Sequence, residues 1–253
     1  MLRIWVIGGT QDSREIVNQL EKTYQVRTTV ATEFGKQCLP TAIVGQMDSA
    51  KMLSFIKEHN ISLCVDCSHP YAVDVSQNAM RACARASIPY LRFERQASPS
   101  QAHVTHVRDT AEAIAYLKQL EGNILLTTGS NSLGHYVNGL PLERLYVRVL
   151  PQSEVLLKCE ALGLTAGNVL AIKGPFDIEM NKAMLRYCKA TVLVTKESGV
   201  AGGVVEKVQA AQDLGVQVIV IDRPMVYYLN KVSTVKEVLE FVKRWALPKP
   251  APF

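Results

Sequence analysis

Short apolar runs alternate with amphipathic segments along the whole chain, and this alternation limits the fold more than any other feature. Residues 3–9 (RIWVIGG), 25–32 (QVRTTVAT) and 61–67 (ISLCVDC) have the composition of buried strands. Residues 12–23 (DSREIVNQLEKT) carry apolar side chains at helical spacing, with Asp12 or Ser13 expected as the N-cap. Such an alternation predicts an α/β fold in which a parallel sheet is covered by helices on both faces.

The second half of the chain repeats the plan of the first. Residues 81–96 (RACARASIPYLRFERQ) align without a gap with residues 209–224 (QAAQDLGVQVIVIDRP), so that Ala82 matches Ala210 at an offset of 128. The same offset carries residues 103–109 onto 231–237. We therefore expect two Rossmann-like domains related by internal duplication, at 1–120 and 121–253, with parallel sheets and a ligand cleft between them. In open α/β sheets, ligands bind beyond the carboxyl ends of the strands.

Composition narrows the cellular setting and the partners. The 253 residues are 48% apolar, yet no apolar run is long enough to span a bilayer, and the start of the chain does not have the pattern of a signal peptide. The six cysteines are scattered through apolar segments, which is typical of reduced core thiols. A net charge of +5, spread without a basic block, favours a small anionic ligand over nucleic acid or a membrane. We expect a cytoplasmic protein.

Residues 64–72 (CVDCSHPYA) allow three interpretations: a redox dithiol, a metal site, or the rim of a ligand site. Cys64 and Cys67 are three residues apart on or just past a strand, so they should point to opposite faces and pack as separate thiols. His69 has no second ligand at a suitable spacing, and we expect no metal. The rim interpretation is favoured, because Pro70 ends the strand and the next helix should begin near Val73. A rigid turn capped by His69 is the plainer alternative.

Residues 6–14 (VIGGTQDSR) form a strand, a glycine turn and the start of a helix. The backbone amides of Gly9 and Thr10 and the Thr10 hydroxyl are placed to cradle a phosphate, and Arg14 is close enough to reach back to it. The motif is not a complete G-x-G-x-x-G, and an ordinary tight turn is the alternative. The second strand ends at Thr32 without the acidic residue that usually holds a ribose diol, which weakly favours NADPH over NADH.

The equivalent strand ends in the second half are also rich in polar groups and glycines. Lys196 and Ser198 precede a turn that includes Gly199, Gly202 and Gly203, which suits a polyanionic ligand. A mobile connection between strand and helix is the alternative. No nucleophile–base pair or paired carboxylate set stands out anywhere. That pattern favours hydride transfer, in which the protein mainly positions a cofactor and a substrate.

Taken in order, several segments resemble the precorrin-6A reductase family, which includes the cobalt-precorrin-6A reductases of the anaerobic cobalamin pathway. They are IGGTQDSREI, DCSHPYA, IPYLRFER, LLTTGS, KGPF, TKESG and AAQDLGVQVIVIDRP, and together they cover nearly the whole chain. The family's opening turn often carries Glu where this chain has Asp12. The resemblance implies reduction of one double bond in a corrin-precursor macrocycle by NADPH or NADH, and neighbouring enzymes of the pathway as further partners.

The resemblance and the strand ends together imply roles for individual residues. His69 and Tyr71 would shape the nicotinamide end and are candidate proton donors, with bulk water as a third. The cofactor would be held by Gly8, Gly9, Thr10, Arg14, Thr32, Ser68, His69 and Pro70. The substrate carboxylates would be held by Arg95, Thr128, Gly129, Ser130, Lys196, Ser198, Gly199 and Gly202, in a basic cleft that also offers Arg92, Lys173 and Arg223. A reductase of a smaller carboxylate, a dinucleotide sensor without turnover and a two-lobed glycosyltransferase-like protein are the rival interpretations.

Overall fold

The computed structural model describes residues 2–98, 103–199 and 202–246. The chain folds into two compact units. The first unit comprises Met1–Gln96 together with Met225–Phe253, and the second comprises Ala97–Pro224. Every strand pairing in both units is parallel. The prediction of two Rossmann-like domains with parallel sheets is therefore confirmed.

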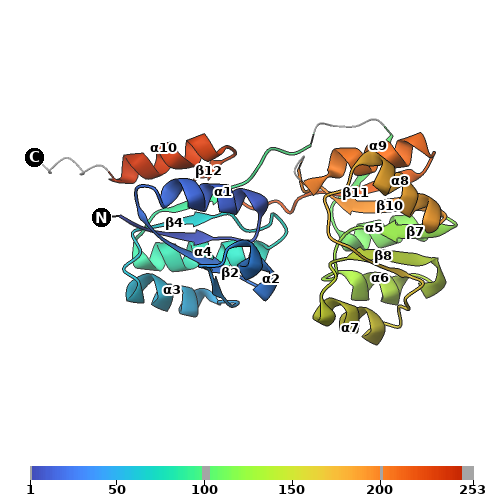
Figure 1. Cartoon of the computed structure of the whole chain (residues 1–253), viewed down its shortest axis with the longest axis horizontal. Helices are drawn as coiled ribbons and strands as arrows, with labels where there is room; N and C mark the ends of the chain where they lie inside the picture. The colour runs from blue at the N-terminus through green and yellow to red at the C-terminus, as the bar shows by residue number, and fades with distance from the viewer. Residues whose placement is uncertain (1, 99–102, 200–201, 247–253) are drawn as a thin grey trace, which may run out of the picture. The chain divides into compact units, whose positions relative to one another are not determined.

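The first sheet has six strands, and helices cover both of its faces. Its strand order is β12 (Lys231–Val232), β5 (Tyr90–Phe93), β4 (Leu63–Asp66), β1 (Arg3–Ile7), β2 (Gln25–Val30) and β3 (Ile43–Val44). Its helices are α1 (Gln11–Leu20), α2 (Glu33–Cys38), α3 (Ser49–Glu58), α4 (Val73–Ala86) and α10 (Val235–Ala246). Figure 1 shows α1 and α10 on one side of this sheet and α3 and α4 on the other.

The second sheet repeats the first. Its strand order is β6 (Val104–Val107), β11 (Gln217–Ile221), β10 (Ala190–Lys196), β7 (Asn123–Leu126), β8 (Leu145–Val149) and β9 (Val169–Ala171). Its helices are α5 (Thr110–Leu117), α6 (Leu133–Gly139), α7 (Ser153–Ala161), α8 (Ile178–Tyr187) and α9 (Val204–Asp213), with a short 3₁₀ turn at Leu142–Arg144. Figure 1 shows α8 and α9 on one side of this sheet and α6 and α7 on the other.

The two units exchange their last strand and helix. After β5, the chain leaves the first sheet, and β6 joins the edge of the second sheet beside β11. After β11, the chain returns, and β12 joins the edge of the first sheet beside β5. Numbered along the chain within its unit, the first sheet has the order 6-5-4-1-2-3 of dinucleotide-binding Rossmann folds. The second sheet has the same arrangement, except that the edge place of the sixth strand is taken by β6, the first strand of its unit. The expected boundary at residue 120 is corrected accordingly, because residues 97–120 lie in the second unit and residues 225–253 in the first.

Successive side chains of β1 point to opposite faces of the first sheet and pack in the two cores of the first unit. Ile4 and Val6 face one side and pack in a cluster with α1 and with Phe241 of α10. Trp5 and Ile7 face the other side and pack in a cluster with α3 and α4. Since successive strand residues point to opposite faces, one apolar run supplies both cores and fixes the register of the strand. The carboxyl edge of the sheet, where the strands give way to polar turns, is thereby held in place.

Among the residues that the structure describes, no helix has both the length and the apolar character needed to cross a membrane.

Candidate functional site

The turn between β1 and α1 opens at Gly9. The Gly8 amide donates to the Thr29 carbonyl at 2.8 Å and continues the pairing of β1 with β2. Gly9 has φ +130°, a conformation that L side chains rarely adopt, and a Cβ placed on it would meet no atom within 4 Å. The space above this backbone is therefore open to a ligand. The Gly9 and Thr10 amides, which were predicted to cradle a phosphate, each donate to the Ser13 hydroxyl at 3.3 Å instead. The amides at the start of α1 beyond them have no acceptor within the helix, as at every helix start.

Thr10 is the N-cap of α1, so the expectation of Asp12 or Ser13 in that role was wrong. The Thr10 hydroxyl accepts from the Ser13 amide at 3.2 Å, and the Ser13 hydroxyl accepts in turn from the Thr10 amide. Ser13 is instead the third residue of the helix, and it is buried within this capping box. The Thr10 hydroxyl also donates to the Cys67 carbonyl at 3.1 Å, and this bond joins the turn after β1 to the turn after β4.

Cys64 and Cys67 are both buried, and they pack in clusters on opposite faces of the first sheet, as predicted. Burial raises the pKa of both thiols well above its usual range. The next cause is a hydrogen bond with the Cys83 side chain for Cys64 and the negative charge of Asp66 for Cys67. Thiolate formation is disfavoured at both positions. Redox chemistry needs the thiolate, so the geometry does not support a reactive dithiol.

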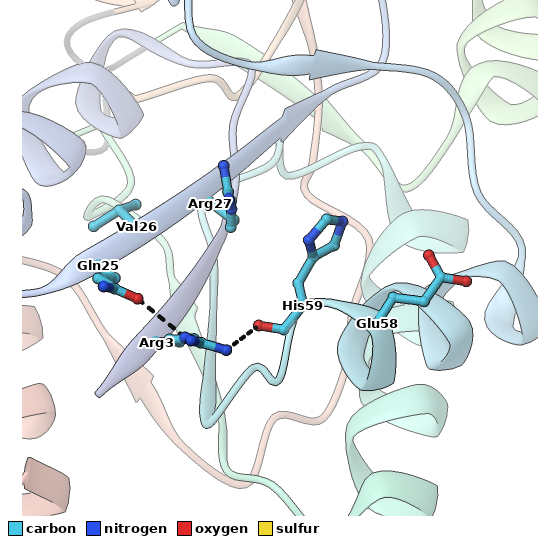
Figure 2. Close-up of a pocket in the computed structure, with 6 residues that line it drawn as sticks. All are labelled: Arg3, Gln25, Val26, Arg27, Glu58 and His59. Carbon is cyan, nitrogen blue, oxygen red and sulfur yellow. Dashed lines mark hydrogen bonds between the residues drawn. The ribbon is translucent and has the colours of Figure 1, made fainter. Parts of the chain in front are cut away.

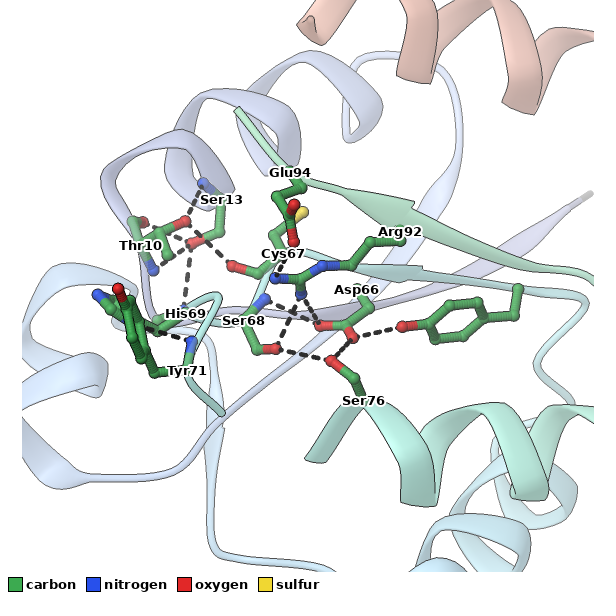
Figure 3. A network of polar contacts seen from close by, with 12 residues as sticks. Thr10, Ser13, Asp66, Cys67, Ser68, His69, Tyr71, Ser76, Arg92 and Glu94 are labelled. Atoms are coloured by element: carbon green, nitrogen blue, oxygen red, sulfur yellow. Dashed lines mark hydrogen bonds and ion pairs between the residues drawn. The ribbon is translucent and has the colours of Figure 1, made fainter. Parts of the chain in front are cut away.

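The turn after β4 presents two rings beside the glycine turn (Figure 3). The ring centroids of His69 and Tyr71 are 5.5 Å apart, and the planes are inclined by 38°. The Tyr71 amide donates to His69 Nδ1 at 3.4 Å. His69 is exposed and Pro70 and Tyr71 are half-buried, whereas Ser68 is buried beneath them. Helix α4 begins at Val73, which confirms the predicted helix start.

A buried ion pair lies beneath this turn. Asp66 ends β4, and its register partner on β5 is Arg92; both side chains are fully buried. The two groups approach to 3.1 Å, and Arg92 also donates to the Ser68 hydroxyl at 3.0 Å. Burial alone would lower the pKa of Arg92, but Asp66 and other negative neighbours outweigh it, and the net pKa is raised. Sequence reasoning placed Arg92 among the cleft cations, whereas the structure places it in the interior.

Three further donors satisfy the Asp66 carboxylate. The Ser68 amide donates to one carboxylate oxygen at 2.9 Å. The hydroxyls of Ser76 and Tyr90 donate to the other at 2.6 and 2.5 Å. Burial, followed by the charge of Asp66 and its hydrogen bond, raises the pKa of the Tyr90 phenol far above its usual range. The sequence shows an Asp and an Arg in two otherwise apolar strands, but only the register of β4 and β5 brings them together.

The remaining residues predicted to bind the cofactor lie around the same edge of the first sheet, together with one residue that was predicted to bind the substrate. Thr32 is the exposed N-cap of α2, where its hydroxyl accepts from the Gly35 amide at 3.2 Å. Arg14 is exposed on α1. Arg95, which was predicted to bind substrate, lies in the first unit, and its guanidinium pairs with Asp12 in the first turn of α1. This pairing offsets a negative charge that would otherwise repel an anion at the helix start.

The residues predicted to bind the substrate from the second unit lie at two neighbouring strand ends. Thr128, Gly129 and Ser130 follow β7, and the strand paired with it, β10, leads into the second group, formed by Lys196, Ser198, Gly199 and Gly202. Val200 and Ala201 of the predicted loop lie outside the described residues. A Cβ on Gly202 would lie 1.9 Å from the Ser198 hydroxyl oxygen, so glycine is required there.

Glu197 organises the second loop and was not predicted. Its carboxylate oxygen Oε1 accepts from the amides of Ser98 and Gly199 at 3.0 and 2.9 Å. Arg223 Nε donates to the Glu197 carbonyl at 3.0 Å, and its guanidinium lies 3.8 Å from Oε1. Arg223 at the end of β11 therefore contacts the loop after β10. The sequence feature that could have indicated this role is an acidic residue between Lys196 and Ser198 at the end of a strand.

Two further cations with a lowered pKa, one buried and one half-buried, were also missed. Lys207 on α9 is 7% exposed, and its ammonium donates to the Thr195 hydroxyl at 3.1 Å. Burial, followed by the charge of Arg148, lowers the pKa of Lys207 to about 7. Burial also lowers the pKa of Arg148 to about 10, and its guanidinium donates to the Asn181 side chain at 2.8 Å. The sequence feature that could have indicated the burial of Lys207 is its place among apolar residues in the segment VVEKVQAA.

A surface pocket of about 530 Å³ lies elsewhere (Figure 2). It is lined by Arg3, Gln25, Val26, Arg27, Glu58 and His59. Arg3 and Gln25 begin β1 and β2, so the pocket is at the amino end of these strands. Arg3 is already engaged, with Gln25 at 3.0 Å and the His59 carbonyl at 3.5 Å. None of the predicted site residues lines it.

Comparison with known proteins places the whole chain in one family. The chain is 39% identical over 245 residues to the cobalt-precorrin-6A reductase of Priestia megaterium, covering 93% of this chain and 96% of the relative. It is 38% identical to the enzyme of that name from Salmonella typhimurium, covering 87% of each. The solved structure of the CobK precorrin-6A reductase matches with a TM-score of 0.83 and 26% identity, over 97% of this chain and 98% of that one. Residues 3–243 match the family model described as precorrin-6x reductase CbiJ/CobK, and the chain belongs to that family.

Proposed function

We propose that the protein is an oxidoreductase that uses a nicotinamide nucleotide to reduce precorrin-6A, or its cobalt form, to the 6B state. The overall reaction consumes one NAD(P)H and one proton and saturates one double bond of the macrocycle. The observation that carries the proposal is the joined pair of turns at the carboxyl edge of the first sheet. There Thr10 ties an open glycine turn to the turn that presents His69 and Tyr71.

The first unit suits a dinucleotide. Gly9 leaves open space over the backbone at the start of α1, where helix amides attract a phosphate. The acidic residue of that helix turn, Asp12, is offset by Arg95. Gly8, Thr10, Arg14, Thr32, Ser68 and Pro70 lie at the same edge and complete the proposed cofactor site. When bound, the nucleotide supplies the hydride.

His69 and Tyr71 are proposed to face the nicotinamide end and to manage the proton. Because His69 Nδ1 accepts from the Tyr71 amide, a neutral imidazole would carry its proton on Nε2. To act as the acid, the ring would first take a second proton from solvent on Nδ1 and give up the bond to the Tyr71 amide. The imidazolium could then release the Nε2 proton to the carbon next to the one that accepts hydride and return to the neutral form. The Tyr71 hydroxyl and bulk water are the alternative proton sources.

The second unit is proposed to hold the substrate carboxylates. Thr128, Gly129 and Ser130 offer hydroxyls and backbone amides, and Lys196, Ser198, Gly199 and Gly202 offer a cation and a close backbone approach. Burial lowers the pKa of Lys196, so a bound carboxylate would favour its charged form.

We infer that NADPH is the preferred nucleotide, since β2 ends at Val30 with Ala31 and Thr32 beyond it and no acid at its tip for the ribose diol. The proposed setting is the cytoplasm, where the macrocycle is exchanged with neighbouring pathway enzymes. A reductase of a smaller carboxylate and a dinucleotide sensor without turnover are the alternatives that the assay below separates.

The test is an anaerobic assay with precorrin-6A or its cobalt form, and with NADPH and NADH separately. Nicotinamide absorbance and the macrocycle spectrum are followed together. Oxidation of one nucleotide with a matching two-electron change in the macrocycle supports the proposal and identifies the cofactor. Nucleotide binding without turnover of either macrocycle favours the alternatives.

A further inference from the structure

Arg92 contacts two segments that are far apart in the sequence. Toward the turn after β4, its Nη1 lies 3.1 Å from Asp66 and donates to the Ser68 hydroxyl. The same Asp66 accepts from the Ser68 amide. The first residue of the turn is thus held through both its backbone and its side chain by one buried ion pair. Figure 3 shows these groups converging beside His69 and Tyr71.

On the other side, Arg92 is held by the segment that returns to the first unit after β11. The ring of Tyr228 lies 5.5 Å from the guanidinium carbon and is stacked with Tyr90 at 6.4 Å. The Arg92 amide donates to the Asn230 carbonyl at 2.9 Å, and the Asn230 side chain donates to the Tyr90 carbonyl at 3.2 Å. Residues 228–230 therefore close over the buried ion pair.

The guanidinium has few hydrogen bonds for a fully buried charge. Nε and Nη2 have no hydrogen-bond partner among the described residues, and Nη2 has only an ion pair with Glu94 at 3.5 Å. Its orientation therefore depends on Asp66 and Ser68 at Nη1, on the ion pair with Glu94 at Nη2 and on the Tyr228 ring. Loss of the ring would free the guanidinium to rotate away from Ser68.

We propose that Arg92 is a positioning residue for dinucleotide binding. It gives the Ser68–Tyr71 turn its binding geometry only while Tyr228 and Asn230 are docked over it, so the returning segment and the cofactor site act as one unit. The proposal rests on the proposed function, which places the nucleotide at this turn. Arg92 itself touches neither the cofactor nor the substrate.

The test measures the dissociation constants of NADPH and NADH by nucleotide fluorescence, without macrocycle, on the full-length protein. Adjacent tyrosines provide a matched pair, because Tyr228 lies over Arg92 and Tyr227 is 85% exposed. Tyr228→Ala is expected to raise the dissociation constant about threefold, the effect of a cation–π contact. Arg92→Lys, which cannot reach Asp66 and Ser68 together, should raise it roughly tenfold. Tyr227→Ala should leave it unchanged.

A buried control separates positioning from general loss of stability. Trp5→Phe removes a 2.9 Å hydrogen bond to Thr29 on the same face of the same sheet. This variant should lower the urea concentration at the midpoint of unfolding without changing the affinity for the nucleotide. The proposal is overturned if Tyr228→Ala binds the nucleotide like the unmodified protein, or if Trp5→Phe weakens binding as much as Arg92→Lys. Tyr228 is only half-buried, so its variant tests the proposal even if Arg92→Lys does not fold.

Failure of the proposed function gives a different result. If Gly9→Asp binds nucleotide normally, the cofactor does not lie at the glycine turn, and both proposals fall. If Gly9→Asp abolishes binding while the variants of Arg92 and Tyr228 have no effect, only the positioning role is refuted.

Discussion

The Thr10 hydroxyl donates to the Cys67 carbonyl at 3.1 Å and accepts from the Ser13 amide at 3.2 Å. One side chain therefore caps α1 and ties the turn after β1 to the turn after β4. These strands are neighbours in the sheet, so the two turns lie side by side at its carboxyl edge. The Thr10 hydroxyl thus connects the turn proposed to bind the phosphate with the turn proposed to face the nicotinamide.

Thr10→Val removes both bonds while keeping the shape of the side chain. We expect a loss of about 1 kcal/mol in the free energy of unfolding, as for other N-caps, together with weaker NADPH binding. Urea unfolding and nucleotide fluorescence measure the two effects. Asp109→Ala removes the cap of α5 in the second unit and should lower stability alone. Equal NADPH affinity in both variants would contradict the role of Thr10.

Gly9 offers a test of the phosphate position. Gly9→Asp is expected to abolish dinucleotide binding, because it places a charge and a side chain in the open space at the start of α1. Gly9→Ala adds only backbone strain at φ +130° and a methyl group, and should weaken binding less. Isothermal titration with NADPH ranks the two. Normal binding by Gly9→Asp would move the cofactor elsewhere.

The candidate site was partly predictable from the sequence. Gly9, Thr10, Ser68 and His69 were identified because strand ends in α/β sheets carry ligand sites, and the structure brings their turns together. The role of Arg92 was not predictable, because its partner Asp66 is in contact only once β4 and β5 are in register. Local sequence shows a cation after an apolar run but not whether the fold buries it.

Lys207 should make stability depend on pH. Burial lowers its pKa from the ordinary 10.5 to about 7, so between these values the unfolded chain binds the extra proton. The penalty for burying the charge is fully present below pH 7, and stability should rise as pH increases from about 7 to about 10.5. At about 1.4 kcal/mol for each pKa unit, the change amounts to several kcal/mol at most.

Lys207→Met tests this directly. The variant should be more stable than the unmodified protein at pH 6.5, and the difference should shrink steadily by pH 10, as measured by urea unfolding under reducing conditions. Thr195 loses its partner in this variant, which costs about 1 kcal/mol at every pH. The exposed Lys118→Met is the control. A difference that stayed constant with pH would show that Lys207 is charged in the folded state throughout.

Gly202 tests the role of the loop after β10. A Cβ there would lie 1.9 Å from the Ser198 hydroxyl oxygen and 2.5 Å from Ser198 Cβ, so Gly202→Ala must displace the loop backbone. We expect KM for the macrocycle to rise roughly tenfold, with unchanged NADPH affinity. Gly134→Ala in α6, where the nearest atom is 3.8 Å away, should be neutral. An unchanged KM in Gly202→Ala would exclude this loop from the substrate site.

The duplication was visible in the sequence, but the exchange of strands was not. The offset of 128 aligns β5 with β11 and β6 with β12, whichever sheet the last strand joins. Both edge strands are short and mix polar with apolar residues, so composition does not select a partner. One signal lay in the connections: residues 94–103 (ERQASPSQAH) and 222–230 (DRPMVYYLN) have no amphipathic helical pattern. Neighbouring parallel strands of one sheet need a crossover, usually helical, so these connections favour passage to another sheet.

The exchange predicts which fragments fold. A chain of residues 1–120 lacks β12 and α10, and therefore lacks Val238, Phe241 and Val242, which are buried in the core of the first unit. Burial of each such side chain contributes about 1.5–3 kcal/mol, which together is comparable with the whole stability of a domain. Residues 1–96 joined by a flexible linker to 225–253 contain the complete first unit.

We expect the joined chain to unfold cooperatively in urea and to bind NADPH, and the 1–120 chain to do neither. Tryptophan fluorescence reports unfolding, because Trp5 lies in the core of this unit. Residues 97–224 provide the corresponding test for the second unit and should fold, whereas 121–253 lacks β6 from the sheet edge beside β11 and should not. Cooperative unfolding of the 1–120 chain would mean that the first sheet does not need the exchanged strand and helix, and that the contacts of α10 contribute little to its stability.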